Sequence, residues 1–210
     1  MEVLLTGFEP FDGADTNPSW DAVDAVRPSG YRLTTLRLPC VFGDSLAALR
    51  EALAARRYDV VVCVGQAGGR VGITPERVAV NLDDARIPDN AGARPIDEPV
   101  VAGGPAAYFT GLPVKACVAA LEAEGIPASV SHSAGTFVCN HVFYGLMHLV
   151  ATEHPGVRAG FVHVPFAPEQ ASTGRHPSLP VATTARALEV IVRTSLTTAA
   201  DLRTTAGTLH

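Results

Sequence analysis

The stretch FGDSLAALREALAARRYDVVVCVG, residues 42–65, decides the fold class. Over residues 42–57 the apolar side chains recur at helical spacing, which predicts an amphipathic helix. Residues 59–65 form a short, almost continuously apolar run, which is typical of a strand that is buried on both faces. A helix that leads directly into a buried strand is the building unit of α/β proteins with a parallel sheet.

The same alternation continues in both directions along the chain. Further strands are predicted at residues 2–7, 31–39, 127–135 and 159–166, with a strand-like piece at 77–82. Further helices are predicted to begin at Pro18 behind the N-cap Asn17, to cover residues 112–125 and 140–154, and to follow Pro180. The sequence therefore predicts a three-layer α/β/α sandwich with a largely parallel, twisted central sheet.

Composition indicates one globular domain over residues 1–210. Hydrophobic residues make up 47% and charged residues 18% of the chain, which provides a large core and excludes global disorder. No linker or internal repeat divides the chain. The tail after about residue 195 is polar and weakly patterned, so we expect it to fray.

Charge and hydropathy exclude two classes of partner. The formal net charge is −5 and no run of Lys or Arg forms a basic stripe, which argues against nucleic acid. No apolar run has transmembrane length, and Met1 leads directly into EVLLTG rather than into a leader pattern. These features predict a cytoplasmic protein without a membrane partner.

The four cysteines form neither a C-x-x-C pair nor a zinc-like cluster with histidine. We therefore expect free thiols and no metal. Cys63 lies in a buried-strand pattern and Cys117 in a helix pattern, so both are interpreted as packing residues. Cys40 is ambiguous.

Cys139 is the cysteine with a candidate chemical role. It follows a predicted strand and stands where a helix opens, in GTFVCNHVFYG, residues 135–145. A helix N-terminus presents unpaired N–H groups and a positive dipole end, which would lower the pKa of the thiol and could hold an oxyanion. Cysteine is also among the most buried residue types, so simple packing is the alternative.

A nucleophilic cysteine needs a base. His141 lies two residues further along the same helix and would point to a different face, and His132 lies inside a strand. His163 lies at the carboxyl end of its strand, where sites of α/β sheets form, so it is the best of the seven histidines. The charged segment 73–90 could orient its imidazole, or could only hold local ion pairs such as Glu76 with Arg77.

Two further motifs are incomplete. GQAGGRVG resembles a phosphate loop, but Ala67 stands where the dinucleotide pattern requires glycine, and the P-loop Gly-Lys-Ser/Thr is absent. GDSLA resembles a serine nucleophile elbow, but Ala47 replaces its last glycine.

Four motifs in the same order resemble the pyroglutamyl-peptidase I family: LLTGFEPF, GQAGGR-x-x-ITPERVA-x-NLDDARIPDN, SAGTFVCNHVFYGLMH and FVHVPFAPEQ. The resemblance runs from about residue 3 to 170 and implies an α/β/α cysteine peptidase that needs no cofactor. The family removes N-terminal pyroglutamyl (5-oxoprolyl) residues from small peptides. Its Glu, Cys and His triad falls on Glu76, Cys139 and His163. Family members often form homo-oligomers, and we expect the same here.

The resemblance also implies a substrate pocket. Its predicted lining residues are Phe8, Phe11, Gln66, Ile87, Phe137 and Val138. Asn17 would fix the neighbouring loop or the lactam. Arg86 would polarise the substrate carbonyl, or would form a structural ion pair with Asp83 or Asp84. For the two N-terminal phenylalanines, ordinary core packing is the alternative.

Two other functions are compatible with this architecture. One is a phosphate-binding transferase similar to nucleoside phosphorylases, which would use GQAGG to hold the anion. The other is a binding protein without catalysis. The presence of Glu76, Cys139 and His163 argues against the second.

Overall fold

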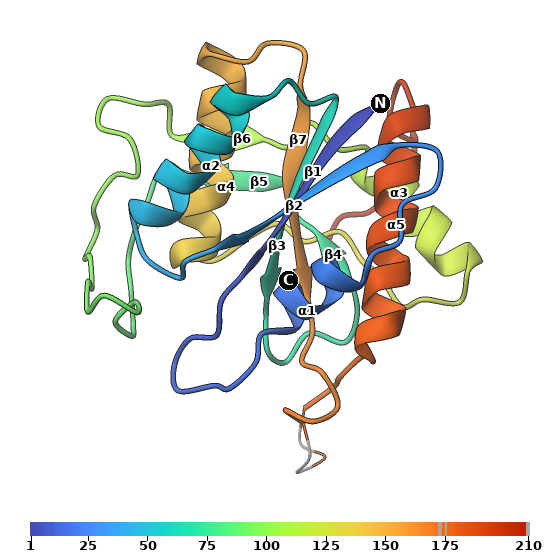
Figure 1. Ribbon diagram of the computed structural model, residues 1–210, viewed down its shortest axis with the longest axis horizontal. Coiled ribbons are helices and arrows are strands. Elements are labelled where there is room, and N and C mark those ends of the chain that lie inside the picture. Colours follow the sequence, from blue (N-terminus) through green and yellow to red (C-terminus); the bar gives the residue numbers. More distant parts are fainter. Residues whose placement is uncertain (172–173, 175, 209–210) are drawn as a thin grey trace.

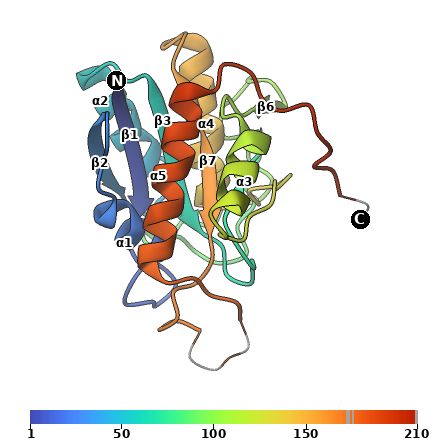
Figure 2. The ribbon, with the colours of Figure 1, turned by 90° about the vertical axis from the view of Figure 1, so that its right-hand side faces the viewer.

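The computed structural model describes residues 1–171, 174 and 176–208, and it has the three layers that the sequence predicts (Figures 1 and 2). The central sheet is five-stranded with the order β2-β1-β3-β7-β4. Its strands are β1 (Glu2–Phe8), β2 (Arg32–Leu38), β3 (Val60–Gln66), β4 (Thr74–Pro75) and β7 (Arg158–Val164). All neighbours pair in parallel except the short β4, which runs antiparallel to β7.

Helices cover both faces of this sheet. α1, α3 and α5 share one hydrophobic cluster, whereas α2 and α4 share another. Figure 1 shows α3 and α5 on one side of the sheet and α2 and α4 on the other. The chain steps from β1 to β2 in one direction and from β2 past β1 to β3 in the other, so right-handed crossovers place α1 and α2 on opposite faces. The helices are α1 (Pro18–Ala25), α2 (Asp44–Ala55), α3 (Val114–Ala123), α4 (Val138–Thr152) and α5 (Val181–Thr197).

None of the helices in the described part of the chain has both the length and the apolar character needed to cross a bilayer.

Alternation along the central strands determines which side chains meet which helices. In β3, Val62 and Val64 belong to the cluster under α1, α3 and α5, whereas Cys63 faces α2 and α4. In β7, Val162 faces the first cluster and Phe161 the second. Residues two apart along a strand share a face, so His163, two positions after Phe161, also points toward α4.

The segment predicted as a strand at 127–135 is not one of the strands. It runs parallel to residues 73–76 through isolated bridges, with Ser131 N–H donating to the Pro75 carbonyl and Arg77 N–H donating to the Ser131 carbonyl. Pro75 has no N–H to continue the pairing, which limits the ladder at this edge. Residues 77–82 do contribute a strand, β5 (Val78–Val80), which pairs with β6 (Ala107–Phe109) in a separate two-stranded sheet.

The tail beyond α5 lies against α3, whereas the sequence predicts fraying. The Asp201 carboxylate accepts hydrogen bonds from the N–H groups of Lys115 (3.2 Å) and Ala116 (2.9 Å) in the first turn of α3. That turn begins after Pro113, whose side chain supplies no cap, so the tail satisfies two helix donors from a distance in sequence.

Candidate active site

The candidate site lies at the carboxyl ends of β3 and β7. Gly65 of β3 and His163 of β7 are register partners in the parallel ladder. This is the edge at which α/β sheets bind ligands, beside the point where the strand order reverses. His163 follows Phe161 by two positions and therefore points toward α4, with the two rings 4.9 Å apart.

His163 is held by a buried carboxylate. Its Nδ1 lies 2.7 Å from Oε1 of Glu76, which follows β4 directly, and the Glu76 N–H donates to the Phe161 carbonyl at 2.9 Å. Glu76 has no exposed surface and His163 is 3% exposed. A carboxylate only accepts hydrogen bonds, so Nδ1 carries the proton and Nε2 is the free ring nitrogen.

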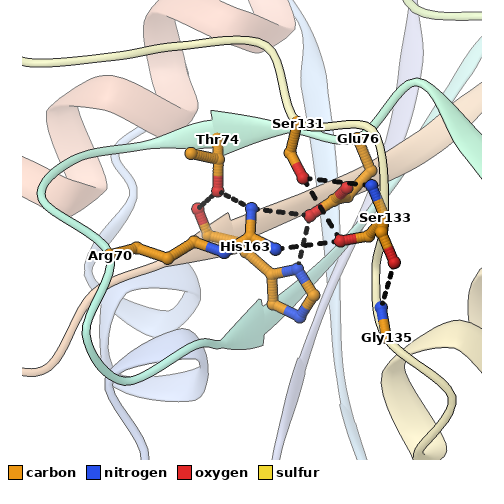
Figure 3. Close-up of polar contacts among 7 residues, drawn as sticks. All are labelled: Arg70, Thr74, Glu76, Ser131, Ser133, Gly135 and His163. Atoms are coloured by element: carbon orange, nitrogen blue, oxygen red, sulfur yellow. Dashed lines mark hydrogen bonds and ion pairs between the residues drawn. The ribbon is translucent and has the colours of Figure 1, made fainter. Parts of the chain in front are cut away.

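Arg70, which the sequence analysis overlooks, completes this cluster (Figure 3). Its Nη1 lies 2.9 Å from the same Oε1 of Glu76 and donates to Thr74 Oγ1 at 2.7 Å. Its Nη2 donates to the Ser133 carbonyl at 3.0 Å. The available signal was a charged residue in the loop after a buried strand. The ion pair considered between Glu76 and Arg77 does not form, because Glu76 faces β7.

Cys139 lies in the first turn of α4. A β-carbon built on Gly65 would lie 2.7 Å from Cys139 Sγ, so the sulfur occupies the space above the bare backbone of β3. The N-cap Phe137 provides no side-chain cap, and the first intrahelical bond is from His141 N–H to the Phe137 carbonyl. The N–H groups of Val138 and Cys139 precede this bond and have no acceptor within the helix.

The expected lowering of the Cys139 pKa is wrong in direction. Burial raises the pKa of this thiol, and the nearby Arg70 charge opposes the increase only in part. The pKa of His163 is lowered, because burial outweighs the hydrogen bond and the charge of Glu76. Both directions favour a neutral thiol beside a neutral imidazole in the free protein.

His141 belongs to a different cluster, as the helix geometry predicts. Its Nδ1 lies 2.8 Å from Oδ2 of the buried Asp83, and its Nε2 accepts from Gly43 N–H at 3.1 Å. Asp83 is therefore committed to His141. Arg86 is exposed and forms no ion pair with Asp83 or with any other acid in the part of the chain that the structure describes.

Four of the predicted pocket residues are half-buried. The rings of Phe11 and Phe137 lie 6.1 Å apart. The loop that carries Arg86 and Ile87 is fastened to the segment before α4, because Asp84 N–H donates to the Thr136 carbonyl at 2.9 Å. The side-chain oxygen of Gln66 accepts from Gln170 Nε2 at 3.0 Å. The half-buried residues are Phe11, Gln66, Ile87 and Phe137.

Phe8 and Val138 have side chains buried in the core, and Asn17 lies in the loop before α1. Phe8 is 2% exposed and packs on Phe161, and Val138 has no exposed surface, because the alternation of β1 and the face of α4 direct both side chains into the core. Asn17 caps α1, accepting from Ser19 N–H at 3.1 Å and donating to the Glu9 carbonyl at 2.9 Å. These bonds tie the loop at Glu9 to the start of α1, which agrees with the first of the two roles expected of Asn17.

The glycine-rich loop after β3 is explained by packing. A β-carbon on Gly68 would lie 2.3 Å from the Phe166 ring, so glycine permits this close approach. The neighbouring Ala67 N–H is already bonded to the Val164 carbonyl at 2.9 Å. Within residues 1–171, 174 and 176–208, no group of three His, Cys, Asp or Glu side chains is arranged to hold a metal ion.

Comparison with known proteins finds the family that the sequence motifs resemble, over nearly the whole chain. The pyroglutamyl peptidase family model matches residues 1–198. The pyrrolidone-carboxylate peptidase of Streptomyces coelicolor is 59% identical, with 99% of each chain covered. The crystal structure of pyroglutamyl peptidase I from Bacillus amyloliquefaciens superposes with a TM-score of 0.95 at 49% identity, covering 97% of this chain and 99% of that one. A mutant pyrrolidone carboxyl peptidase from Pyrococcus furiosus gives 0.89 at 39% identity, with 93% and 98% covered. The chain belongs to the pyroglutamyl peptidase family of cysteine peptidases.

Proposed function

We propose that Cys139, His163 and Glu76 are the catalytic triad with which this protein removes N-terminal pyroglutamate from peptides. The observation that carries the proposal is the buried Glu76–His163 pair together with the sulfur of Cys139, which lies over Gly65, the register partner of His163 on the neighbouring strand. A nucleophile, a base and a group that orients the base are the three parts that acyl transfer requires.

The first step joins deprotonation to attack. Because Glu76 holds Nδ1–H, Nε2 of His163 takes the proton of the Cys139 thiol while sulfur attacks the carbonyl carbon after the lactam ring. The tetrahedral oxyanion accepts hydrogen bonds from the free N–H groups of Val138 and Cys139, where the helix dipole is positive. A neutral pair suits this step, since the base must be unprotonated before attack.

The second half returns the proton. The imidazolium of His163 protonates the leaving amine as the C–N bond breaks, and the shortened peptide departs. His163 then removes a proton from water, which attacks the thioester and releases pyroglutamate with the thiol restored. Glu76 stabilises the imidazolium in both halves.

The substrate is an uncharged lactam, which calls for apolar walls and a few polar contacts. Phe11, Ile87 and Phe137 provide such walls beside Cys139. Gln66, at the end of β3, would offer a backbone group to the lactam amide. Arg86 is exposed on the same loop as Ile87 and would polarise the substrate carbonyl with its guanidinium.

Hydrolysis of a fluorogenic pyroglutamyl amide tests the proposal. We expect turnover that iodoacetamide abolishes and that EDTA leaves unchanged. Cys139→Ser should retain the fold with no measurable turnover, whereas the matched control Cys63→Ser should keep activity per folded molecule and lose stability, because it buries a hydroxyl. Substantial activity in folded Cys139→Ser would refute the triad.

The cellular setting is inferred on separate grounds. All four cysteines are free thiols, which suits the reducing cytoplasm.

Three large apolar side chains are mostly exposed, which supports a homo-oligomer that covers them: Val71, Ile96 and Phe109. Light scattering on the purified protein measures its mass, and a monomer at working concentration would contradict the homo-oligomer.

A further inference from the structure

We propose that Arg70 is a positioning residue of the site, which shares the carboxylate of Glu76 with His163 and thereby limits the negative charge that the imidazole experiences. This inference rests on the proposed function. It adds a fourth member to the triad, with the opposite effect on the base from that of Glu76.

The geometry gives Arg70 a fixed place. Its Nη1 and the Nδ1 of His163 converge on one oxygen of Glu76, at 2.9 Å and 2.7 Å. The guanidinium is also anchored on Thr74 Oγ1 and on the Ser133 carbonyl (Figure 3). Three separate acceptors hold a planar fork in one orientation. The other Glu76 oxygen is buried and has no partner among the described residues, so Oε1 carries all the contacts of this carboxylate.

The consequence concerns charge. A buried carboxylate facing only an imidazole strongly favours imidazolium, which cannot accept a thiol proton. Paired with Arg70, Glu76 forms a neutral unit that still orients Nδ1–H. The positive charge of Arg70 lowers the pKa of His163, and it also opposes the increase in the Cys139 pKa that burial causes. The first effect keeps the imidazole unprotonated, and so able to accept a proton, down to a lower pH, and the second makes the Cys139 thiol a better proton donor.

Few other groups can set the charge state of His163. Glu76 faces it from the end of β4, Arg70 from the loop after β3, and the Cys139 thiol from α4. The neighbour on β7 is the apolar ring of Phe161. His141 is turned away toward Asp83. Removal of Arg70 should therefore change the charge state of His163, because no other described residue brings a cation to Glu76.

The test is the pH dependence of kcat/KM for the full-length protein on a fluorogenic pyroglutamyl amide. In Arg70→Met we expect the acidic limb to move up by about one pH unit, as the loss of a nearby cation predicts. At a pH below both limbs this lowers kcat/KM about tenfold, with a much smaller change on the plateau. Arg70→Lys keeps the charge and should keep the limb near its original position. The matched control Arg77→Met removes the arginine that follows Glu76 in the chain, whose guanidinium forms no ion pair with that carboxylate, and should not move the limb.

A second readout does not depend on turnover. In a Cys139→Ser background, NMR titration of the His163 imidazole should shift to higher pH when Arg70→Met is added. An unchanged limb and an unchanged titration, or a shift to lower pH, would overturn the proposal even if the peptidase activity stands. If Arg70→Met does not fold, Arg70→Gln, which keeps donors for Thr74 and Ser133 without charge, carries the same expectation. Absence of peptidase activity in wild type would count against the proposed function, while the titration would still decide the role of Arg70.

Discussion

Gly65 and Cys139 fit together only because Gly65 has no side chain. A β-carbon at Gly65 would lie 2.7 Å from Cys139 Sγ and 2.8 Å from the Phe161 ring, both closer than real contacts allow. The missing side chain at Gly65 therefore leaves space above β3, and Cys139 Sγ from the first turn of α4 occupies this space.

Gly65→Ala should lower kcat/KM by about 100-fold, because displacement of a nucleophile by about 1 Å has an effect of that order. Stability should fall less than in a large core disruption, since only one methyl group is added. Steady-state kinetics and urea unfolding measure the two effects. Gly207→Ala is the control, because nothing lies within 4 Å of a β-carbon there. Wild-type kinetics in Gly65→Ala would mean that the sulfur does not act from this position.

His163→Ala and His141→Ala should separate catalysis from structure. Loss of the base should reduce kcat by about 10³-fold or more, within the range for general acid–base catalysis. Loss of His141 should reduce kcat/KM less than tenfold, but it leaves the buried Asp83 carboxylate and Gly43 N–H without their partner. We expect that variant to lose about 1–3 kcal/mol of unfolding free energy. Equal kinetic losses in the two folded variants would contradict the choice of His163 over His141 as the base.

Phe11→Ala tests the pocket. The ring packs 6.1 Å from Phe137 at a half-buried position, so its removal should raise KM for a pyroglutamyl amide more than it reduces stability. Wild type should cleave a prolyl amide poorly, since that ring carries a charged nitrogen and lacks the lactam oxygen, which leaves a donor of the site unpaired. Similar kcat/KM values for both amides in wild type would remove the basis for this pocket.

Alkylation should report the raised pKa of Cys139. Only thiolate reacts with iodoacetamide, and a raised pKa lowers the thiolate fraction at any given pH. Inactivation should thus be slow at neutral pH and accelerate about tenfold per pH unit into the alkaline range. The inactivation rate against pH, with the modified residue located by mass spectrometry, measures this. A fast rate that is constant from pH 6 to 8 would instead indicate a preformed thiolate–imidazolium pair.

Asp201→Ala should destabilise the protein without altering catalysis. It removes the acceptor for two N–H groups in the first turn of α3, and helix-cap losses of this kind amount to about 1 kcal/mol. Thermal unfolding of the variant against wild type tests this, and Glu122→Ala, an exposed acid late in the same helix, is the control. Identical unfolding of Asp201→Ala and wild type would mean that the tail contributes nothing to α3.

The sequence by itself determined the layers and the family. Buried strands such as DVVVCVG and amphipathic helices have different apolar periods, so local pattern was sufficient to place them. It also located Cys139 at a helix start, because the Gly-containing turn and the following apolar period are local signals. The prediction of a strand at 127–135 was wrong, because the pattern of an extended segment does not show whether its neighbour has the N–H groups needed for a ladder. The neighbour here contains Pro75, which has none.

Only the tertiary structure decided which side chains of the site contact one another. His163 and Glu76 are 87 residues apart in sequence, and their contact depends on the pairing of β4 with β7. Arg70 joins them through a loop conformation that no periodicity encodes. The direction of the Cys139 pKa depends on burial by neighbours from β3 and β7, which outweighs the opposing charge of Arg70. Charge and desolvation act through space, so side chains that are distant in sequence set them.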